Sequence, residues 1–210
     1  MRLTRSNRRL AGLMAALAVV LWLTPAAAQE PQAPTPRSTA GQLLVATPEL
    51  QDPNFVQTVV YVVSHSPEGA MGFVVNRVIG TVRAADLAGV LGIEAARASG
   101  DVRLHVGGPV APRLPFVLHS RDYATDGTIV VDGSIAFTAG TDVEVAMFTV
   151  KGAPARRLVV FGHAGWAPGQ LDAEIAANVW VVVPAEDAIV FDDDVDTKWQ
   201  RALALFEVTL

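Results

Sequence analysis

The chain has 210 residues and a formal net charge of −5 at pH 7, a length that suits one domain with a real hydrophobic core. It contains no cysteine, which excludes disulfides, thiolate metal sites and thiol nucleophiles.

Residues 1–28 have the pattern of a secretory signal peptide. Four arginines precede the uncharged apolar run Leu10–Leu23, and Pro25 with Ala26–Ala28 supplies the small residues of a cleavage site. The run is short for a bilayer span, which needs roughly 20 residues. We therefore expect a periplasmic or otherwise exported protein that meets the membrane only transiently. The alternative, a cytoplasmic protein, requires that the start of the chain is misassigned.

Residues 29–40 contain three prolines and few apolar side chains, so we expect an extended linker. The globular domain then comprises residues 41–210. Removal of residues 1–28 leaves 12 basic against 21 acidic residues and a net charge of −9. Because sequence-independent nucleic-acid binding depends mainly on Lys and Arg contacts to phosphates, this balance argues against a nucleic-acid partner.

Short β-type runs are spread through the domain. Several of them, such as residues 58–63, are apolar on both faces, which predicts strands covered from both sides. The predicted strands are Gln42–Ala46, Thr58–Ser64, Ala70–Asn76, Val102–Val106, Phe116–His119, Thr128–Val131, Leu158–Phe161, Val179–Val183 and Ala188–Phe191.

Three amphipathic segments predict helices that can cover this sheet: Val82–Leu91, Thr141–Val150 and Thr197–Leu205. Strands and helices do not alternate strictly. The sequence therefore favours a mixed α/β or α+β single domain over a doubly wound sheet.

A further helix is predicted after Pro168. We expect the strand before it to end at Phe161 and the glycines at 162 and 165 to turn the chain. With Ala167 as N-cap and Pro168 at the first helical position, Trp166 and Leu171 have the spacing of a hydrophobic staple. Turn geometry explains these glycines better than a phosphate-binding loop does, because the spacing of a P-loop is missing.

The motifs also form a recognisable series. They are Leu43–Ala46, Asp52-Pro53, Thr58–Tyr61, His65, Gly69–Gly72, Asn76-Arg77, Gly107–Val110, Phe116–Ser120, Ala164–Trp166, Pro168–Leu171, Glu174, Asn178, Trp180, Asp187, Phe191 and Trp199. In this order the chain resembles the bacterial YqgE/AlgH family over essentially all of residues 41–210. The resemblance implies an α+β fold, with a curved or branched β-sheet, a barrel-like portion and surrounding helices. It implies no settled activity, although the family carries a label of transcriptional regulation.

Two features depart from the family pattern. The signal peptide and linker are unusual for a group generally treated as cytoplasmic, and His163 stands where an aromatic residue such as tyrosine is expected. The sequence also lacks a helix-turn-helix motif. A transcriptional role is therefore the alternative interpretation, tied to a cytoplasmic location.

Polar residues at strand ends supply the candidate binding site. We predict a groove that binds a peptide or a small anion, lined by His65, Asn76, Arg77, His119, Ser120, His163 and Trp166. The competing structural interpretation is that these histidines bond to backbone groups at strand ends, and that Asn76 and Arg77 bond within the fold.

Catalysis by these residues would need contacts that the sequence does not encode locally. No G-x-S-x-G motif surrounds Ser120, so a hydrolase requires the fold to bring His65 or His163 to it. The histidines at 65, 105, 119 and 163 have no metal-ligand spacing. We expect no catalytic residue, metal or cofactor, and an exported binding or accessory module with an unknown protein, peptide or small-anion partner. A histidine-dependent hydrolase or metal enzyme is the remaining alternative.

Overall fold

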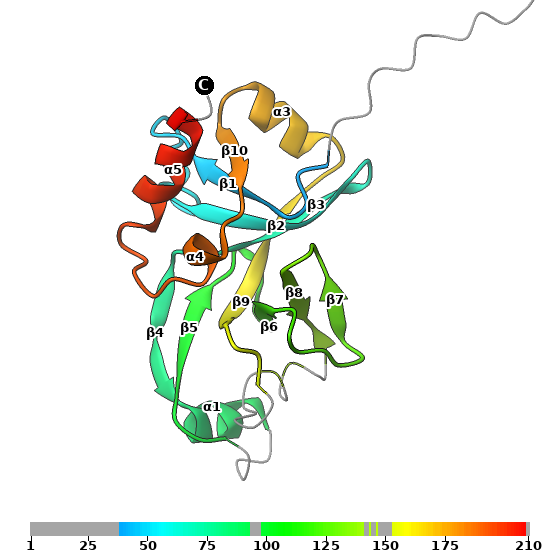
Figure 1. Cartoon of the computed structure of the whole chain (residues 1–210), viewed down its shortest axis with the longest axis vertical. Coiled ribbons are helices and arrows are strands. Elements are labelled where there is room, and N and C mark those ends of the chain that lie inside the picture. The colour runs from blue at the N-terminus through cyan, green and yellow to red at the C-terminus, as the bar shows by residue number, and fades with distance from the viewer. Residues whose placement is uncertain (1–37, 93–97, 141–142, 144–145, 147–152, 209–210) are drawn as a thin grey trace, which may run out of the picture. The chain divides into compact units, whose positions relative to one another are not determined.

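The computed structural model describes residues 38–92, 98–140, 143, 146 and 153–208 (Figure 1). The predicted signal peptide and residues 29–37 of the linker lie outside the described residues. So does the helix predicted at Thr141–Val150, apart from Val143 and Ala146, which are helical and buried. No helix in the described part of the chain is long and apolar enough to cross a membrane.

Ten strands in the described chain form one curved, branched sheet. Their order is β10-β1-β2-β3-β9-β6-β8-β7, and the hairpin of β4 and β5 joins at β9. All pairs are antiparallel except β5 with β9, which is parallel. The strands are β1 Gln42–Ala46, β2 Val59–Ser66, β3 Gly69–Val74, β4 Val78–Arg83, β5 Asp101–Val106, β6 Val110–Ser120, β7 Thr128–Val130, β8 Ile135–Thr138, β9 Arg157–Trp166 and β10 Trp180–Pro184.

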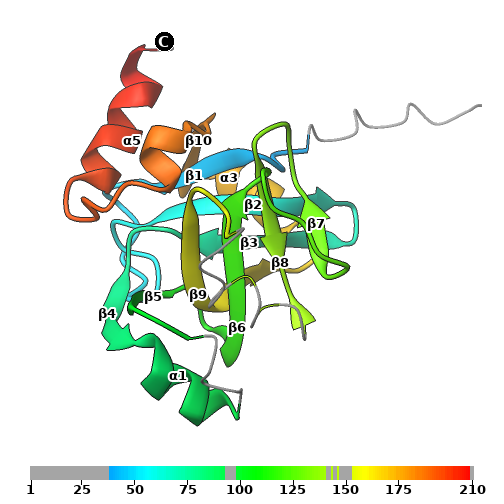
Figure 2. The same cartoon turned by 60° about the horizontal axis from the view of Figure 1, so that its bottom comes forward.

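Strand β9 is the branch point, because its two halves pair with different neighbours on one edge. Residues 164–166 pair with β3, whereas residues 159–161 pair with β5. The opposite edge of β9 pairs with β6. The sheet therefore splits into two parts, one running through β3 and one through the β4–β5 hairpin, as Figures 1 and 2 show.

Helices cover the sheet in three places. Helix α3 (Gln170–Ala176) lies on one face of β1–β3, and α4 (Asp187–Val190) with α5 (Lys198–Val208) packs on the other. Helix α1 (Ala84–Leu91) follows β4 and packs with Val143 and Ala146 against β5 and β9. The fold is thus a single α+β domain with a curled, half-barrel sheet, as predicted.

The two-sided character of β2 is confirmed by the core. Val60 and Val62 belong to the cluster under α3, while Val59, Tyr61 and Val63 belong to the cluster under α4 and α5. Since successive side chains of a strand point to opposite faces, a continuous apolar run supplies both cores at once.

The prediction of a strand at Ala188–Phe191 is wrong. Asp187–Val190 is the short helix α4, whose first turn is closed by bonds from Ile189 and Val190 to the carbonyl of Glu186. A short apolar run does not distinguish a strand from one buried helical turn. Strands β4 and β8 were not predicted, because β4 alternates without a strongly apolar face and β8 spans only four residues.

The predicted turn at Gly162 and Gly165 is also wrong, because β9 continues through both residues to Trp166. Gly162 has φ +71, and a Cβ there would lie 2.5 Å from the carbonyl oxygen of Gly108. A Cβ on Gly108 would in turn lie 2.2 Å from the carbonyl carbon of His163. The glycines therefore allow two backbone segments to cross in contact.

Helix α3 begins later than predicted, at Gln170, with Gly169 rather than Ala167 as its N-cap. Gly169 has φ +72, which a residue with a side chain adopts only with strain. Pro168 therefore lies before the helix. Trp166 and Leu171 still belong to one buried cluster, although not at the positions of a staple.

Candidate functional site

The residues predicted to line one groove lie in separate parts of the sheet. His119 pairs with Arg157 at the start of β9, whereas Trp166, at the end of β9, pairs with Ala70. Nine residues along a strand correspond to roughly 30 Å. The seven predicted residues therefore do not all come together at one place, and each has local partners.

His65 and Trp166 lie at the same end of the sheet, on β2 and β9. His65 Nδ1 is 3.2 Å from the amide nitrogen and 3.0 Å from Oγ1 of Thr39, and its Nε2 is 3.5 Å from the Asp172 carboxylate. Trp166 is buried, and its indole donates a 2.8 Å hydrogen bond to Glu174. His65 thus connects β2 to the segment before β1 and to α3, and Trp166 connects β9 to α3.

Asn76 and Arg77 hold the segment before β2. The Asn76 side chain accepts from the Val59 amide and donates to the Gln57 carbonyl, both at 2.9 Å. Arg77 donates to the carbonyls of Pro53 and Val56, both at 3.0 Å. These bonds agree with the structural interpretation of this pair.

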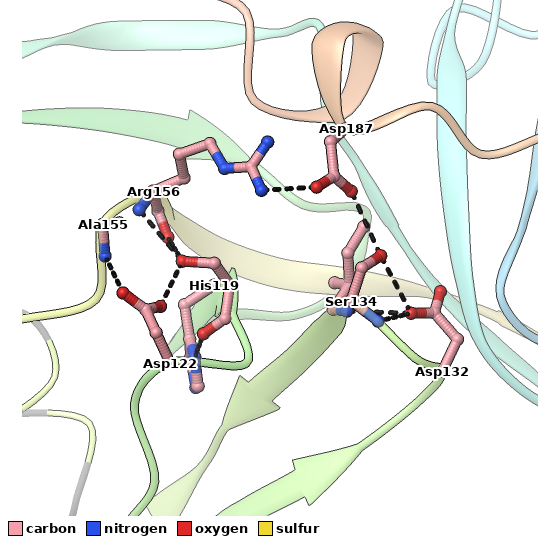
Figure 3. A network of polar contacts seen from close by, with 9 residues as sticks. His119, Asp122, Asp132, Ser134, Ala155, Arg156 and Asp187 are labelled. Atoms are coloured by element: carbon pink, nitrogen blue, oxygen red, sulfur yellow. Dashed lines mark hydrogen bonds and ion pairs between the residues drawn. The ribbon is translucent and has the colours of Figure 1, made fainter.

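His119 and Ser120, at the end of β6, belong to a polar network (Figure 3). The His119 ring is fully buried and bonds at 2.9 Å to Thr138 Oγ1 and to the backbone oxygen of Ser120. The Ser120 hydroxyl instead donates to Asp122 at 2.6 Å. Because no histidine nitrogen contacts this hydroxyl, the described residues do not form the serine–histidine pair that a hydrolase needs.

His163 lies in β9 opposite Val110, and its Nδ1 is 3.4 Å from the backbone oxygen of Ala164. Its ring packs edge-on against Phe116, and burial lowers its pKa. Within the part of the chain that the structure describes, no three His, Asp or Glu side chains lie together in a way that could hold a metal ion.

A different histidine stands in a pocket. His105, on β5, is 2% exposed, and neither of its ring nitrogens has a hydrogen-bond partner among the described residues. It lines a pocket of about 180 Å³ between β5, the start of β9 and Asp193. We call this the His105 pocket. Its wall comprises Asp101, Val102, Arg103, His105, Arg157, Leu158, Val159 and Asp193.

The alternation of β5 explains the composition of this wall. Asp101, Arg103 and His105 are two residues apart and lie on one face, while Val102 and Leu104 enter the core under α1. Arg103 Nη1 reaches across to Asp193, donating to its backbone oxygen at 2.7 Å and to its carboxylate at 3.1 Å. The buried part of the pocket is thus formed by His105 with apolar residues, and its exposed rim is charged.

Burial and neighbouring cations keep the His105 ring neutral. Desolvation, followed by the positive charge of Lys198, lowers its pKa to about 4. The backbone carbonyl of Val159 lies close enough to oppose this shift, but not in the geometry of a hydrogen bond to either ring nitrogen. A neutral imidazole has one donor and one acceptor nitrogen. His105 therefore keeps one donor and one acceptor that the described residues leave unused at the pocket wall.

An open depression of about 470 Å³ adjoins the His105 pocket, since Arg157 and Asp193 line both. Its wall includes Arg156, whose guanidinium lies 5.3 Å from the centre of the Phe191 ring and pairs with Asp187 (Figure 3). Asp187 also accepts from Ser134 at 3.2 Å. These contacts hold the Arg156 side chain at the wall of the depression.

The sequence alone did not reveal this site, although one signal pointed to it. The run Asp101-Val-Arg-Leu-His105 alternates polar with apolar residues, which predicts a strand with a polar face. Asp193 and Phe191 come from about 90 residues further along the chain. No local pattern connects them to that strand.

The fold and pocket define a single-domain α+β protein with a branched sheet and a small polar pocket beside the branch. The chain belongs to the AlgH-like family (DUF179), whose model matches residues 43–210. This confirms the resemblance noted in the sequence.

Individual relatives agree with this assignment. The chain is 44% identical over 163 residues to a UPF0301 protein of Rhodospirillum rubrum, covering 78% of this chain and 84% of the relative. It is 41% identical to a UPF0301 protein of Methylococcus capsulatus, covering 79% and 90%. The solution structure of the AlgH protein from Pseudomonas aeruginosa matches with a TM-score of 0.66 at 34% identity, covering 83% of this chain and 92% of that one. These names indicate no catalytic function.

Proposed function

We propose that this AlgH-like protein is exported and acts as a binding module that takes a small polar ligand in the His105 pocket. The observation that carries the proposal is the His105 ring, which is buried in the pocket wall with both nitrogens unpartnered among the described residues. Leaving a buried donor or acceptor unsatisfied costs about 1–3 kcal/mol. A ligand that bonds to the ring removes that cost, so the ring favours binding.

Export is supported by the basic start, apolar run and small-residue site of residues 1–28. Fractionation of the native organism, followed by determination of the N-terminus of the purified protein, tests it. A chain that begins near residue 29 in the periplasmic fraction agrees with export. An intact N-terminus in the cytoplasm contradicts it.

Binding is tested by isothermal titration of purified protein with acetate, phosphate, methylammonium, glycerol and glycine as separate probes. We expect at least one of these probes to bind, and His105→Leu to abolish that binding. His163→Leu is the matched control, because His163 is also a strand histidine, although only partly buried, and does not line the pocket. The proposal fails if no probe binds, or if His105→Leu binds as the unsubstituted protein does.

A further inference from the structure

Resting on the proposed binding function, we infer that the ligand of the His105 pocket is a small zwitterion, of which a free amino acid with a short side chain is the type. The charges at the rim, the neutral ring at the base and the size of the space between them together suit such a molecule.

The rim carries both signs of charge in equal number. Asp101 and Asp193 are exposed acids, and Arg103 and Arg157 are half-buried bases. A simple anion would lie near two carboxylates, and a simple cation near two guanidinium groups. A molecule with one ammonium and one carboxylate group can place each beside its opposite charge.

The acidic side of the rim can accept an ammonium group. The Asp101 side chain is exposed at the pocket, and although the charge of Arg83 on the neighbouring strand acts on it, its oxygens remain open to solvent as acceptors. The basic side can bind a carboxylate, because a guanidinium has five N–H donors and Arg103 bonds to Asp193 through Nη1.

The contact between Arg103 and Asp193 does not close this rim firmly. The Asp193 side chain is 96% exposed and that of Arg103 is 33% exposed. An ion pair with so exposed a carboxylate contributes little to stability, since that partner is well solvated. A ligand carboxylate can therefore displace the Asp193 carboxylate from Arg103 at small cost.

The size of the pocket restricts the ligand further. A volume of about 180 Å³ is below the roughly 300–1,000 Å³ of pockets that take drug-sized ligands. The pocket therefore suits a molecule as small as glycine or alanine. Larger side chains would have to extend toward the adjoining depression at Arg156 and Phe191.

The experiment compares glycine and alanine with half-molecules that carry one charge each. Isothermal titration is run on purified protein with glycine, alanine, acetate, methylammonium, phosphate and glycerol. We expect glycine or alanine to bind at least tenfold more tightly than acetate, methylammonium, phosphate or glycerol. The two charged ends should contribute together, because each opposite-charge contact is a charge-assisted hydrogen bond.

Three variants test which residue binds the ammonium group of the ligand and which binds its carboxylate group. Asp101→Asn should weaken glycine binding at least tenfold without weakening acetate binding, because it removes only the partner of the ammonium group. Arg103→Gln should weaken both. Arg121→Gln is the matched control, since Arg121 is an exposed arginine that does not line the pocket, and it should weaken neither.

The outcomes separate the ligand class from the binding function. Acetate, phosphate or glycerol could bind as tightly as glycine, with His105→Leu abolishing that binding. The assignment of a zwitterionic ligand is then wrong, while the proposed binding function is retained. Glycine binding that is unaffected by Asp101→Asn also contradicts the assignment of a zwitterionic ligand. If no probe binds, or if binding survives in His105→Leu, both proposals fall.

Discussion

The ammonium group of Lys198 donates a 3.0 Å hydrogen bond to the backbone carbonyl of Val75, just beyond the end of β3. A second bond, of 2.9 Å, reaches the carbonyl of Val190 at the end of α4. Lys198 is 0% exposed, so this cation connects α5 to β3 and α4 inside the protein. Desolvation lowers its pKa to about 8, against the opposing effect of Asp192.

This burial predicts an unusual pH dependence of stability. The folded-state pKa of Lys198 lies below the ordinary value of 10.5, so the unfolded chain binds more protons between pH 8 and 10.5. Stability must therefore rise with pH in that window. The gain is on the order of 3 kcal/mol, because a tenfold change in proton affinity corresponds to about 1.4 kcal/mol. This gain in stability should be absent in the Lys198→Met variant.

Urea unfolding of both proteins from pH 7 to 11 measures this difference. The pKa of Tyr61 is also raised, mainly by burial, but Tyr61 is common to both proteins and its effect cancels in the comparison. Parallel curves for the two proteins would show that Lys198 titrates in the folded state as it does in the unfolded chain.

A second prediction concerns the acid side and His105. Its folded-state pKa of about 4 lies below the ordinary 6.5, so the associated stability is present above pH 6.5 and is lost as the pH falls toward 4. We expect His105→Leu to lack this loss, which is on the order of 3 kcal/mol. Urea unfolding at pH 7, 5.5 and 4 measures it.

The matched control for this substitution is His119→Leu. Both nitrogens of His119 are hydrogen-bonded, so removing the ring leaves Thr138 without one partner and should cost about 1–3 kcal/mol at pH 7. His105→Leu should be no less stable than the unsubstituted protein at that pH, because it removes an unpartnered polar ring. Equal destabilisation by both substitutions would contradict the unpartnered state of His105.

A third prediction tests the backbone crossing at Gly162. Alanine there must adopt φ +71 and place its Cβ 2.5 Å from the Gly108 oxygen. Strain and overpacking together should cost about 3 kcal/mol or more. Gly89→Ala is the control, because Gly89 lies within α1 with no atom within 4 Å of an added Cβ, and it should gain about 0.5–1 kcal/mol. Thermal unfolding of both variants decides the matter, and a Gly162→Ala protein of normal stability would exclude the crowded crossing.

Much of this fold could be predicted because its periodic signals are local. The two-sided run of β2 and the amphipathic stripe of α5 each predict an element whose main body the structure contains. Glycine patterns carry less information. The same glycines in FGHAGW suit a turn between elements or a crowded point within a strand, and only the approach of Gly107 and Gly108 separates the two.

The candidate site could not be predicted for a related reason. His105, Arg103 and Asp193 meet because β5 pairs in parallel with β9 and the segment after α4 lies across both. Parallel pairing between distant segments leaves no trace in the spacing of either. The residues that were predicted, such as Asn76 and Arg77, attract notice as polar side chains at strand ends, where they satisfy the backbone of the next segment.

The last prediction concerns Glu174, whose carboxylate oxygen Oε2 accepts 2.8 Å hydrogen bonds from the indoles of both Trp166 and Trp180. The two rings pack edge-on at 6.1 Å in the core under α3. Glu174→Ala leaves two buried indole donors without an acceptor, so it should lower the free energy of unfolding by about 2–3 kcal/mol. Glu174→Gln keeps an acceptor oxygen and should lose clearly less.

Tryptophan fluorescence during urea unfolding reports both stability and the surroundings of these rings. Glu68→Ala is the control, because Glu68 is an exposed glutamate whose bonds to other described residues lie within its own turn, and it should leave the unfolding curve unchanged. If alanine and glutamine at position 174 cost the same, the carboxylate acts through its charge rather than as the shared acceptor. In that case the hydrogen bond from Trp166 to Glu174 would not be what holds the end of β9 against α3. The packing of the Trp166 ring would have to do so.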